Sequence, residues 1–276
     1  MKNKIVARVA WALSITALVV FAGFPTYWML TTALSSDTEL YKTGQDILPH
    51  LERLGAFPTA FLSMPMLSWL GNSFVIATGT TLLSLLLAVA AGYALSRFRF
   101  YGKGVTGFVL FATQMLPEAL LIVPLYALFA NLGLLNNLGG LVLANAAFTM
   151  PVATFILKGA IDKVPFEIEE SARVDGCSRM GIVSMIVFPL IVPSVAAAAI
   201  ISFFDGWNEF LFANTFISDS ALWPASVGLA SFLGQFFTPI NLVMVAALTF
   251  ALPAIVFFLI AQRSIVSGLT AGSVKG

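Results

Sequence analysis

Six apolar stretches, each long enough to cross a lipid bilayer, constrain this sequence more than any other feature. Roughly 20 apolar residues span the hydrocarbon core as a helix. Charged residues make up only 10% of the chain, too few for a water-facing surface. Since lipid offers the backbone no hydrogen-bond partner, we expect an all-α integral membrane protein, a six-helix transmembrane bundle. The expected spans are about residues 9–34, 70–95, 105–130, 139–160, 183–212 and 241–262.

The positions of Lys and Arg predict which side of the membrane each loop occupies. With the N-terminus inside, only Lys42 and Arg53 of the 14 basic residues fall in outer segments. The inner basic residues are Lys2, Lys4, Arg8, Arg97, Arg99, Lys103, Lys158, Lys163, Arg173, Arg179, Arg263 and Lys275. We therefore expect one transmembrane domain over residues 1–276, both termini cytoplasmic, and a cytoplasmic tail at 263–276.

The scarcity of certain residues excludes several kinds of site. The chain has one histidine, His50, and one cysteine, Cys177, so neither a disulfide within the chain nor a metal site of several His and Cys ligands is possible. The net charge of +1 gives no electrostatic reason to expect binding to nucleic acid.

One polar stretch, "EIEESARVDGCSRM" at residues 167–180, lies between two apolar runs and holds six of the chain's 27 acidic and basic residues. Pro165 suits a first helical position, and the glutamates suit the positive end of the helix dipole. Gly176 suits a left-handed end, which predicts a helix over 165–176. We also expect Glu169 to pair with Arg173 one turn later, on the wetter face.

A bare helix of this length is marginal in water, so we expect it to pack on something. Ile168, Ser171 and Ala172 share one face, and their small side chains would let another surface approach closely. From the residues alone two interpretations stay open. The helix either docks a partner or lies on the lipid surface or on its own spans.

Several motifs resemble those of one transporter family. "EESARVDG" resembles the E-A-A-x-x-x-D-G signature of permease subunits of bacterial ABC importers, and "VPFEIEESARVDGCSRMGIVSMIVFPLIVP" resembles the carbohydrate-uptake, maltose-permease-like branch. "MLPEALLIVPLYALFANLGLLNN", "WNEFLFA" and "GLTAGSVKG" resemble further stretches of that family, in order. The resemblance covers roughly residues 70–276.

The resemblance implies that the polar helix is a coupling helix, which sits in a groove of a cytoplasmic ATPase and transmits its closure to the spans. Ser171 replaces the signature's usual first alanine, and Cys177 stands where alanine is common; both are small. The implied ATPase-coupling residues are Glu170, Ser171, Ala172, Asp175 and Gly176.

The chain has no G-x-x-x-x-G-K-[ST] phosphate loop, so we expect it to be no enzyme and to bind no cofactor. ATP and Mg would be bound by the partner ATPase. The resemblance further implies a second permease subunit in a heterodimer, two ATPase subunits, an extracellular solute-binding protein and a bacterial plasma (inner) membrane. It also implies that the C-terminal tail reaches into the ATPase dimer interface.

Polar residues within the spans are candidates for a solute path, because carboxylates at membrane depth are costly. Glu118 lies near the middle of the third expected span, with Gln114 one turn before it. Asp205, Asn208 and Glu209 share a face near the outer end of the fifth. Carboxylate and amide groups bind sugar hydroxyls. The alternatives are a carboxyl group hydrogen-bonded between helices and an ordinary solvated helix end.

The outer segment 213–240 is rich in aromatic residues. Trp223 and Phe236 could anchor the solute-binding protein, or they could lie at the membrane interface. The pattern leaves two other functions open. A secondary transporter or channel for a small polar solute is the main alternative, although no internal repeat is evident. A membrane-embedded enzyme is the other, although His50 lies outside the membrane. The solute itself cannot be read from the sequence.

Overall fold

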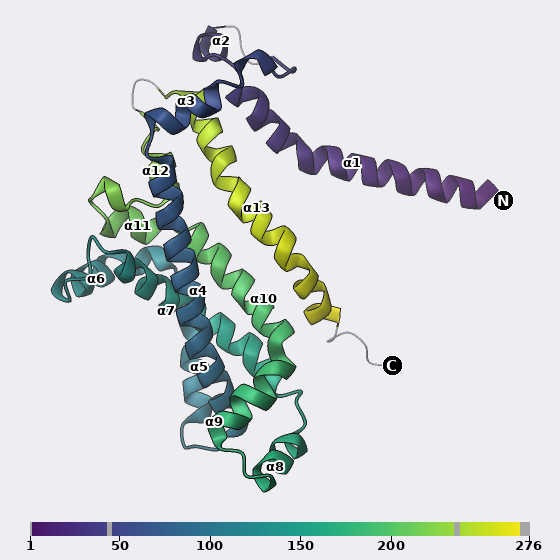
Figure 1. The fold of residues 1–276 in the computed structure, drawn as a ribbon, viewed down its shortest axis with the longest axis vertical. Coiled ribbons are helices and arrows are strands. Elements are labelled where there is room, and N and C mark those ends of the chain that lie inside the picture. Colours follow the sequence, from purple (N-terminus) through teal and green to yellow (C-terminus); the bar gives the residue numbers. More distant parts are fainter. Residues whose placement is uncertain (1, 43–45, 235–237, 271–276) are drawn as a thin grey trace. The chain divides into compact units, whose positions relative to one another are not determined.

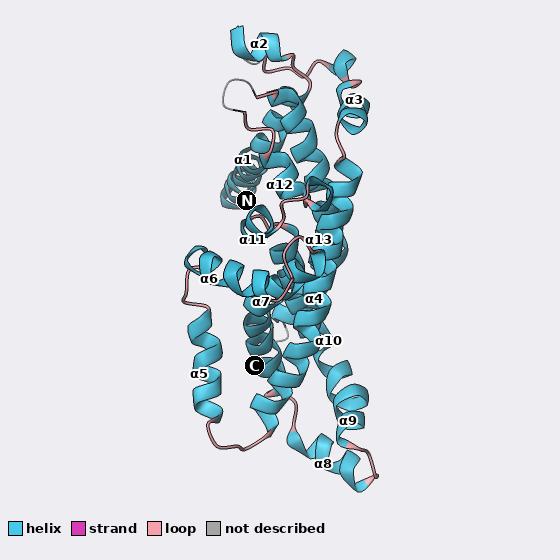
Figure 2. Cartoon of the chain, turned by 90° about the vertical axis from the view of Figure 1, so that its left-hand side faces the viewer, coloured by secondary structure: helices cyan, strands magenta, loops and turns pink. Residues whose placement is uncertain are grey.

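The computed structural model of the chain describes residues 2–42, 46–234 and 238–270. Every regular element within these ranges is a helix, and no strand occurs in them (Figure 2). The predicted all-helical fold class is therefore confirmed. The expected tail at 263–276 is described only to residue 270, as the end of helix α13, and residues 271–276 lie outside the described residues.

The long apolar helices follow the six apolar stretches of the sequence. By length and hydropathy, five helical segments of the described chain could each cross a membrane, or six if one bent pair counts as a single span. The segments are α1 (Lys2–Ala33), α4 (Met66–Arg97), α7 (Leu138–Ile161), the run from Arg179 to Phe216, and α13 (Ile240–Thr270).

The third expected span is bent rather than continuous. Helix α5 (Lys103–Thr113) and helix α6 (Glu118–Asn131) meet at 102°, so the helix expected over 105–130 is broken in two. Pro117 explains the break, because it has no N–H to donate and disfavours helical backbone in the residue before it. Gln114 fixes the bend by donating a side-chain hydrogen bond of 2.9 Å to the Phe148 carbonyl on α7.

The fifth span is built from four consecutive pieces. Helix α9 (Arg179–Gly181) leads into η2 (Ile182–Val187), which has the wider turns of a π-helix, and then into α10 (Phe188–Trp207). Pro189 is the second residue of α10, and a π-helical segment just before it accommodates the hydrogen bond that a proline cannot make. A short break then separates α10 from α11 (Leu211–Phe216).

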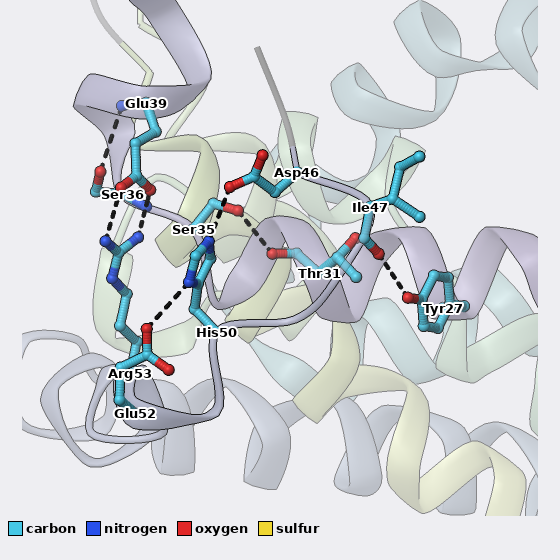
Figure 3. Close-up of polar contacts among 10 residues, drawn as sticks. All are labelled: Tyr27, Thr31, Ser35, Ser36, Glu39, Asp46, Ile47, His50, Glu52 and Arg53. Carbon is cyan, nitrogen blue, oxygen red and sulfur yellow. Dashed lines mark hydrogen bonds and ion pairs between the residues drawn. The ribbon is translucent and has the colours of Figure 1, made fainter. Parts of the chain in front are cut away.

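The chain divides into two compact units, residues 1–66 with 229–252, and residues 67–228 with 253–276. The first unit holds α1, α2 (Asp37–Lys42), η1 (Leu51–Arg53), α3 (Ala56–Ser63) and the first part of α13. In its polar segment the Arg53 guanidinium binds the carboxylate of Glu39 through both terminal nitrogens, and the His50 ring lies 3.0 Å from Asp46 and from Glu52 (Figure 3). Arg53 and His50 of this segment thus have acidic partners within it.

The second unit contains two clusters of buried side chains. One joins α4, α7, α8 (Phe166–Val174) and α10, and includes Leu157, Ile161 and Ile182. The other joins α4, α6, α7 and α11, and includes Phe212 and Phe216. Helix α8 lies at the end of this unit where α4 ends, and α11 lies toward the other end (Figure 1). The two clusters therefore support two separate polar regions.

Candidate functional site

Helix α8 ends at the left-handed glycine that the sequence predicts. Gly176 has φ = +86°, so this part of the prediction is confirmed. The Gly176 N–H donates to the Arg173 carbonyl at 3.0 Å, and the Cys177 N–H donates to the Ala172 carbonyl at 2.9 Å. These bonds satisfy the last carbonyls of the helix and turn the chain toward α9.

The inner face of α8 carries a fully buried carboxylate. Glu169 is 0% exposed; its Oε1 accepts from Nε of Arg97 at 2.5 Å, and its Oε2 accepts from the Tyr93 hydroxyl at 2.8 Å. Arg97 also donates to the Val164 carbonyl at 2.7 Å, just before α8. We call Tyr93, Arg97 and Glu169 the Glu169 cluster. It ties α8 to the end of α4.

The expected pair between Glu169 and Arg173 is wrong. Glu169 faces the bundle, and at a buried position it needs partners from another helix. The guanidinium of Arg173 instead lies 5.4 Å from the centre of the Phe166 ring, and that of Arg97 lies 5.9 Å from the same ring. Ala172 is also on the inner side, at 5% exposure, within the buried cluster around α7 and α10.

The outer face of α8 is exposed. Of the implied coupling residues, Glu170, Ser171, Asp175 and Gly176 lie on it, whereas Ala172 does not. The sequence-based argument missed Val174, an apolar side chain that is 88% exposed at the end of this helix. A single aliphatic residue among charged ones was the only signal for it. The helix thus presents polar groups outward, together with Val174 and the partly exposed side chains of Phe166 and Ile168, each 40% exposed.

At the other end of the unit, four of the five solute-path candidates line one pocket. Its volume is about 330 Å³, and its lining comprises Glu118, Phe204, Asp205, Asn208, Glu209, Phe210 and Leu211. The bend between α5 and α6 places Glu118 in the first turn of α6, where it faces the end of α10. The lining contains carboxylates, an amide and aromatic rings, and no basic residue.

The pocket residues differ in how their polar groups are used. Glu209 is buried, and its Oε1 accepts from the N–H groups of Phe212 at 2.6 Å and Ala213 at 3.2 Å, so it caps α11. Glu118, Asp205 and Asn208 have exposed side chains. Gln114 is not part of the lining and holds the bend instead.

The aromatic residues near the pocket and in the outer segment 213–240 differ in their surroundings. Phe210 lines the pocket, whereas Trp207 is 2% exposed and stacks on Phe203 at 5.8 Å between ring centres. Trp223 is half-buried against the cluster around α6, α7 and α11, so its ring is largely a packing group. Phe236 lies outside the described residues. Within the described part of the chain, no group of His, Cys, Asp and Glu has the arrangement of a metal site.

A family model matches residues 84–269, and it describes a "binding-protein-dependent transport system inner membrane component". The chain is 34% identical over 259 residues to the sulfoquinovosyl glycerol transport system permease protein SmoH of Agrobacterium fabrum, covering 94% of this chain and 91% of that protein. It is 32% identical over 280 residues to the diacetylchitobiose uptake system permease protein DasC of Streptomyces coelicolor, covering both in full.

The trehalose/maltose transport system permease protein MalG of Thermococcus litoralis is 29% identical over 280 residues, again over the whole of both chains. Among solved structures, a bacterial ABC transporter involved in the import of the acidic polysaccharide alginate has a chain of the same fold. The TM-score is 0.80 at 19% identity, covering 95% of this chain and 98% of that one.

Proposed function

Since the chain belongs to the family of binding-protein-dependent transport system inner membrane components, we propose how its two polar regions divide the work of an ABC importer. The chain is a permease subunit for carbohydrate uptake and not an ATPase. Proteins of this kind act with a second permease, separate ATPase subunits and a solute-binding protein. Helix α8 receives the movement of the ATPase, and the acidic pocket belongs to the solute path.

The arrangement of α8 carries this proposal. Its outer face exposes Glu170, Asp175 and Val174, which supply polar and apolar contacts for a groove on a soluble partner. Its inner face is held to α4 through Glu169, and charge-assisted hydrogen bonds in a buried site resist displacement. A force applied to the outer face therefore reaches α4 directly.

The pocket suits a neutral polyol. Carboxylates and amides accept and donate the hydrogen bonds that sugar hydroxyls make, and Phe204 and Phe210 offer apolar faces to a sugar ring. Three carboxylates with no basic side chain disfavour a strongly anionic solute within this subunit. The named solutes of the relatives, diacetylchitobiose and trehalose or maltose among them, support a carbohydrate.

The finer architecture is also proposed. The bent pair α5–α6 counts as one span, which gives six, and the bias of Lys and Arg places both termini and α8 in the cytoplasm. ATP and Mg bind to two ATPase subunits and not to this chain. The pathway is shared with a different permease, and the outer segment 213–240 meets the binding protein.

Cysteine crosslinking tests the role of α8, because the chain has a single native cysteine. In a Cys177→Ser background, Val174→Cys should crosslink to an ATPase subunit in the purified complex. Ala172→Cys, two residues away but buried, is the matched control and should crosslink far less. Equal crosslinking at both positions, or none at Val174→Cys in an assembled complex, would contradict the proposal.

A further inference from the structure

A long apolar groove lies between α4 and the first half of the fifth span, at the end of the unit that carries α8. Its volume is about 740 Å³, within the range of pockets that bind small molecules. One wall is the stripe Leu82, Leu86 and Ala90 on α4, spaced one turn apart. The opposite wall comes from α9, η2 and α10, with Met180, Val183, Ser184, Phe188 and Val195.

The groove is open to the surroundings of the described chain. Leu82 and Leu86 are 65% and 71% exposed, and Met180 is 76% exposed. The lining residues on α4 run from Leu82 to Tyr93, a length of about 16 Å along the helix axis. An apolar channel of this length, parallel to a membrane span, has the shape of an extended hydrocarbon chain.

A cation lies at one end of this groove. Arg179 lines it, and its guanidinium lies 5.7 Å from the centre of the Phe98 ring. None of the ion pairs among the described residues involves Arg179. Further positive charge comes from Arg99 and Lys103 in the adjoining segment, whereas Arg97 is paired with Glu169. Lys103 donates to the Phe98 carbonyl at 3.1 Å.

We propose that this groove binds an anionic phospholipid, with one acyl tail along α4 and the phosphate at Arg179. A guanidinium binds phosphate oxygens through paired N–H groups, which supplies the charge complementarity at the end of the groove. Tyr101 in the adjoining segment is a residue of the kind that lies at headgroup level. The lipid would fill the space beside the Glu169 cluster, because Tyr93 belongs to both.

The test is lipid retention by the purified complex of this chain with its partner subunits. Native mass spectrometry after exchange into mixed phosphatidylglycerol and phosphatidylcholine should show retained phosphatidylglycerol. Arg179→Gln should reduce that retention at least about fivefold, the effect of one basic residue near a membrane surface. Arg8→Gln removes an exposed cation that is not in the lining, and it should leave the retention unchanged.

A second variant tests the binding of the acyl chain independently of charge. Ala90→Trp places a bulky side chain in the groove and should lower the retention of phosphatidylglycerol while Arg179 is intact. Equal retention by the wild type, Arg179→Gln and Ala90→Trp would overturn the proposal. Efficient crosslinking of Leu86→Cys to the second permease, in a Cys177→Ser background, would also overturn it, since the groove would then be a subunit interface.

Discussion

Two Arg–Glu pairs among the described residues have similar chemistry and very different surroundings. In the Glu169 cluster the side chains of Arg97 and Glu169 are 9% and 0% exposed, and a hydroxyl and a carbonyl satisfy their remaining groups. In the polar segment of the first unit, those of Arg53 and Glu39 are 34% and 37% exposed. Screening by water makes exposed pairs worth little, whereas a buried charge that loses its partner is strongly destabilising. The fold therefore depends more on the pair of Arg97 and Glu169 than on the pair of Arg53 and Glu39.

Removing the buried carboxylate should have the largest effect. Glu169→Ala leaves the Arg97 guanidinium buried and unpaired, which costs about 3–5 kcal/mol. Thermal unfolding of the detergent-purified complex should show a clear loss of stability. Glu39→Ala, in the exposed pair, is the control and should change the midpoint little.

A double variant sharpens this comparison. Replacing both partners with apolar residues, Arg97→Met with Glu169→Leu, should recover much of the stability lost in Glu169→Ala, because no charge is then left unpaired. If the double variant is no more stable than Glu169→Ala, the unpaired charge is not the source of the lost stability.

Glu118 represents a third environment, a carboxylate that lines a pocket and has an exposed side chain. If it binds a solute hydroxyl, Glu118→Ala should reduce uptake at limiting solute by roughly 10- to 150-fold, the equivalent of about 1.5–3 kcal/mol. The readout is radiolabelled solute uptake normalised to the amount of assembled complex. Gln114 is not in the pocket lining. Gln114→Ala should therefore act on the bend between α5 and α6, and it should lower the stability of the complex more than the affinity for the solute.

The turn after α8 should be sensitive to side-chain shape rather than to crowding. A Cβ at Gly176 would meet no atom within 4 Å, but φ = +86° is costly for a β-branched residue, on the order of 1–3 kcal/mol. Gly176→Val should therefore weaken transport-coupled ATP hydrolysis. Gly176→Asn tolerates the left-handed region and should retain most of it. Equal transport-coupled ATP hydrolysis by both variants would show that coupling does not depend on the left-handed turn at Gly176.

The smallest effect is expected in the exposed segment. Hydrogen bonds with Asp46, and to a smaller extent with Glu52, raise the pKa of His50. The stability that protonated His50 adds is therefore fully present below its ordinary pKa and is lost as the pH rises through the raised value. The hydrogen bond from Arg53 lowers the pKa of Glu39 to about 2, so Glu39 stays ionised and paired with Arg53 from pH 5 to pH 8. Hydrogen-exchange protection of residues 46–53, relative to the intrinsic exchange rate at each pH, should fall modestly from pH 5 to pH 8. His50→Gln should abolish the trend.

The sequence predicted those features that depend on residues close to one another along the chain. Apolar runs predicted the helical spans, and Gly176 predicted a left-handed helix end. The bend at Pro117 was missed, because an average hydropathy over 20 residues does not register direction. The Glu169 cluster was missed because Arg97 and Tyr93 lie 72 and 76 residues before Glu169 in the sequence. The local i,i+4 rule indicated Arg173 as the partner instead. The pocket was anticipated only as separate residues, because its assembly depends on that bend.

Binding-protein-stimulated ATP hydrolysis by complexes that contain Glu169→Ala tests the central claim most directly. The outer face of α8 is unchanged in this variant, so the ATPase subunits should still co-purify with the permeases. Because α8 is no longer tied to α4, we expect stimulation by the solute-loaded binding protein to fall at least about tenfold, which corresponds to about 1.4 kcal/mol of coupling. Stimulation at the wild-type level in a fully assembled Glu169→Ala complex would contradict the account.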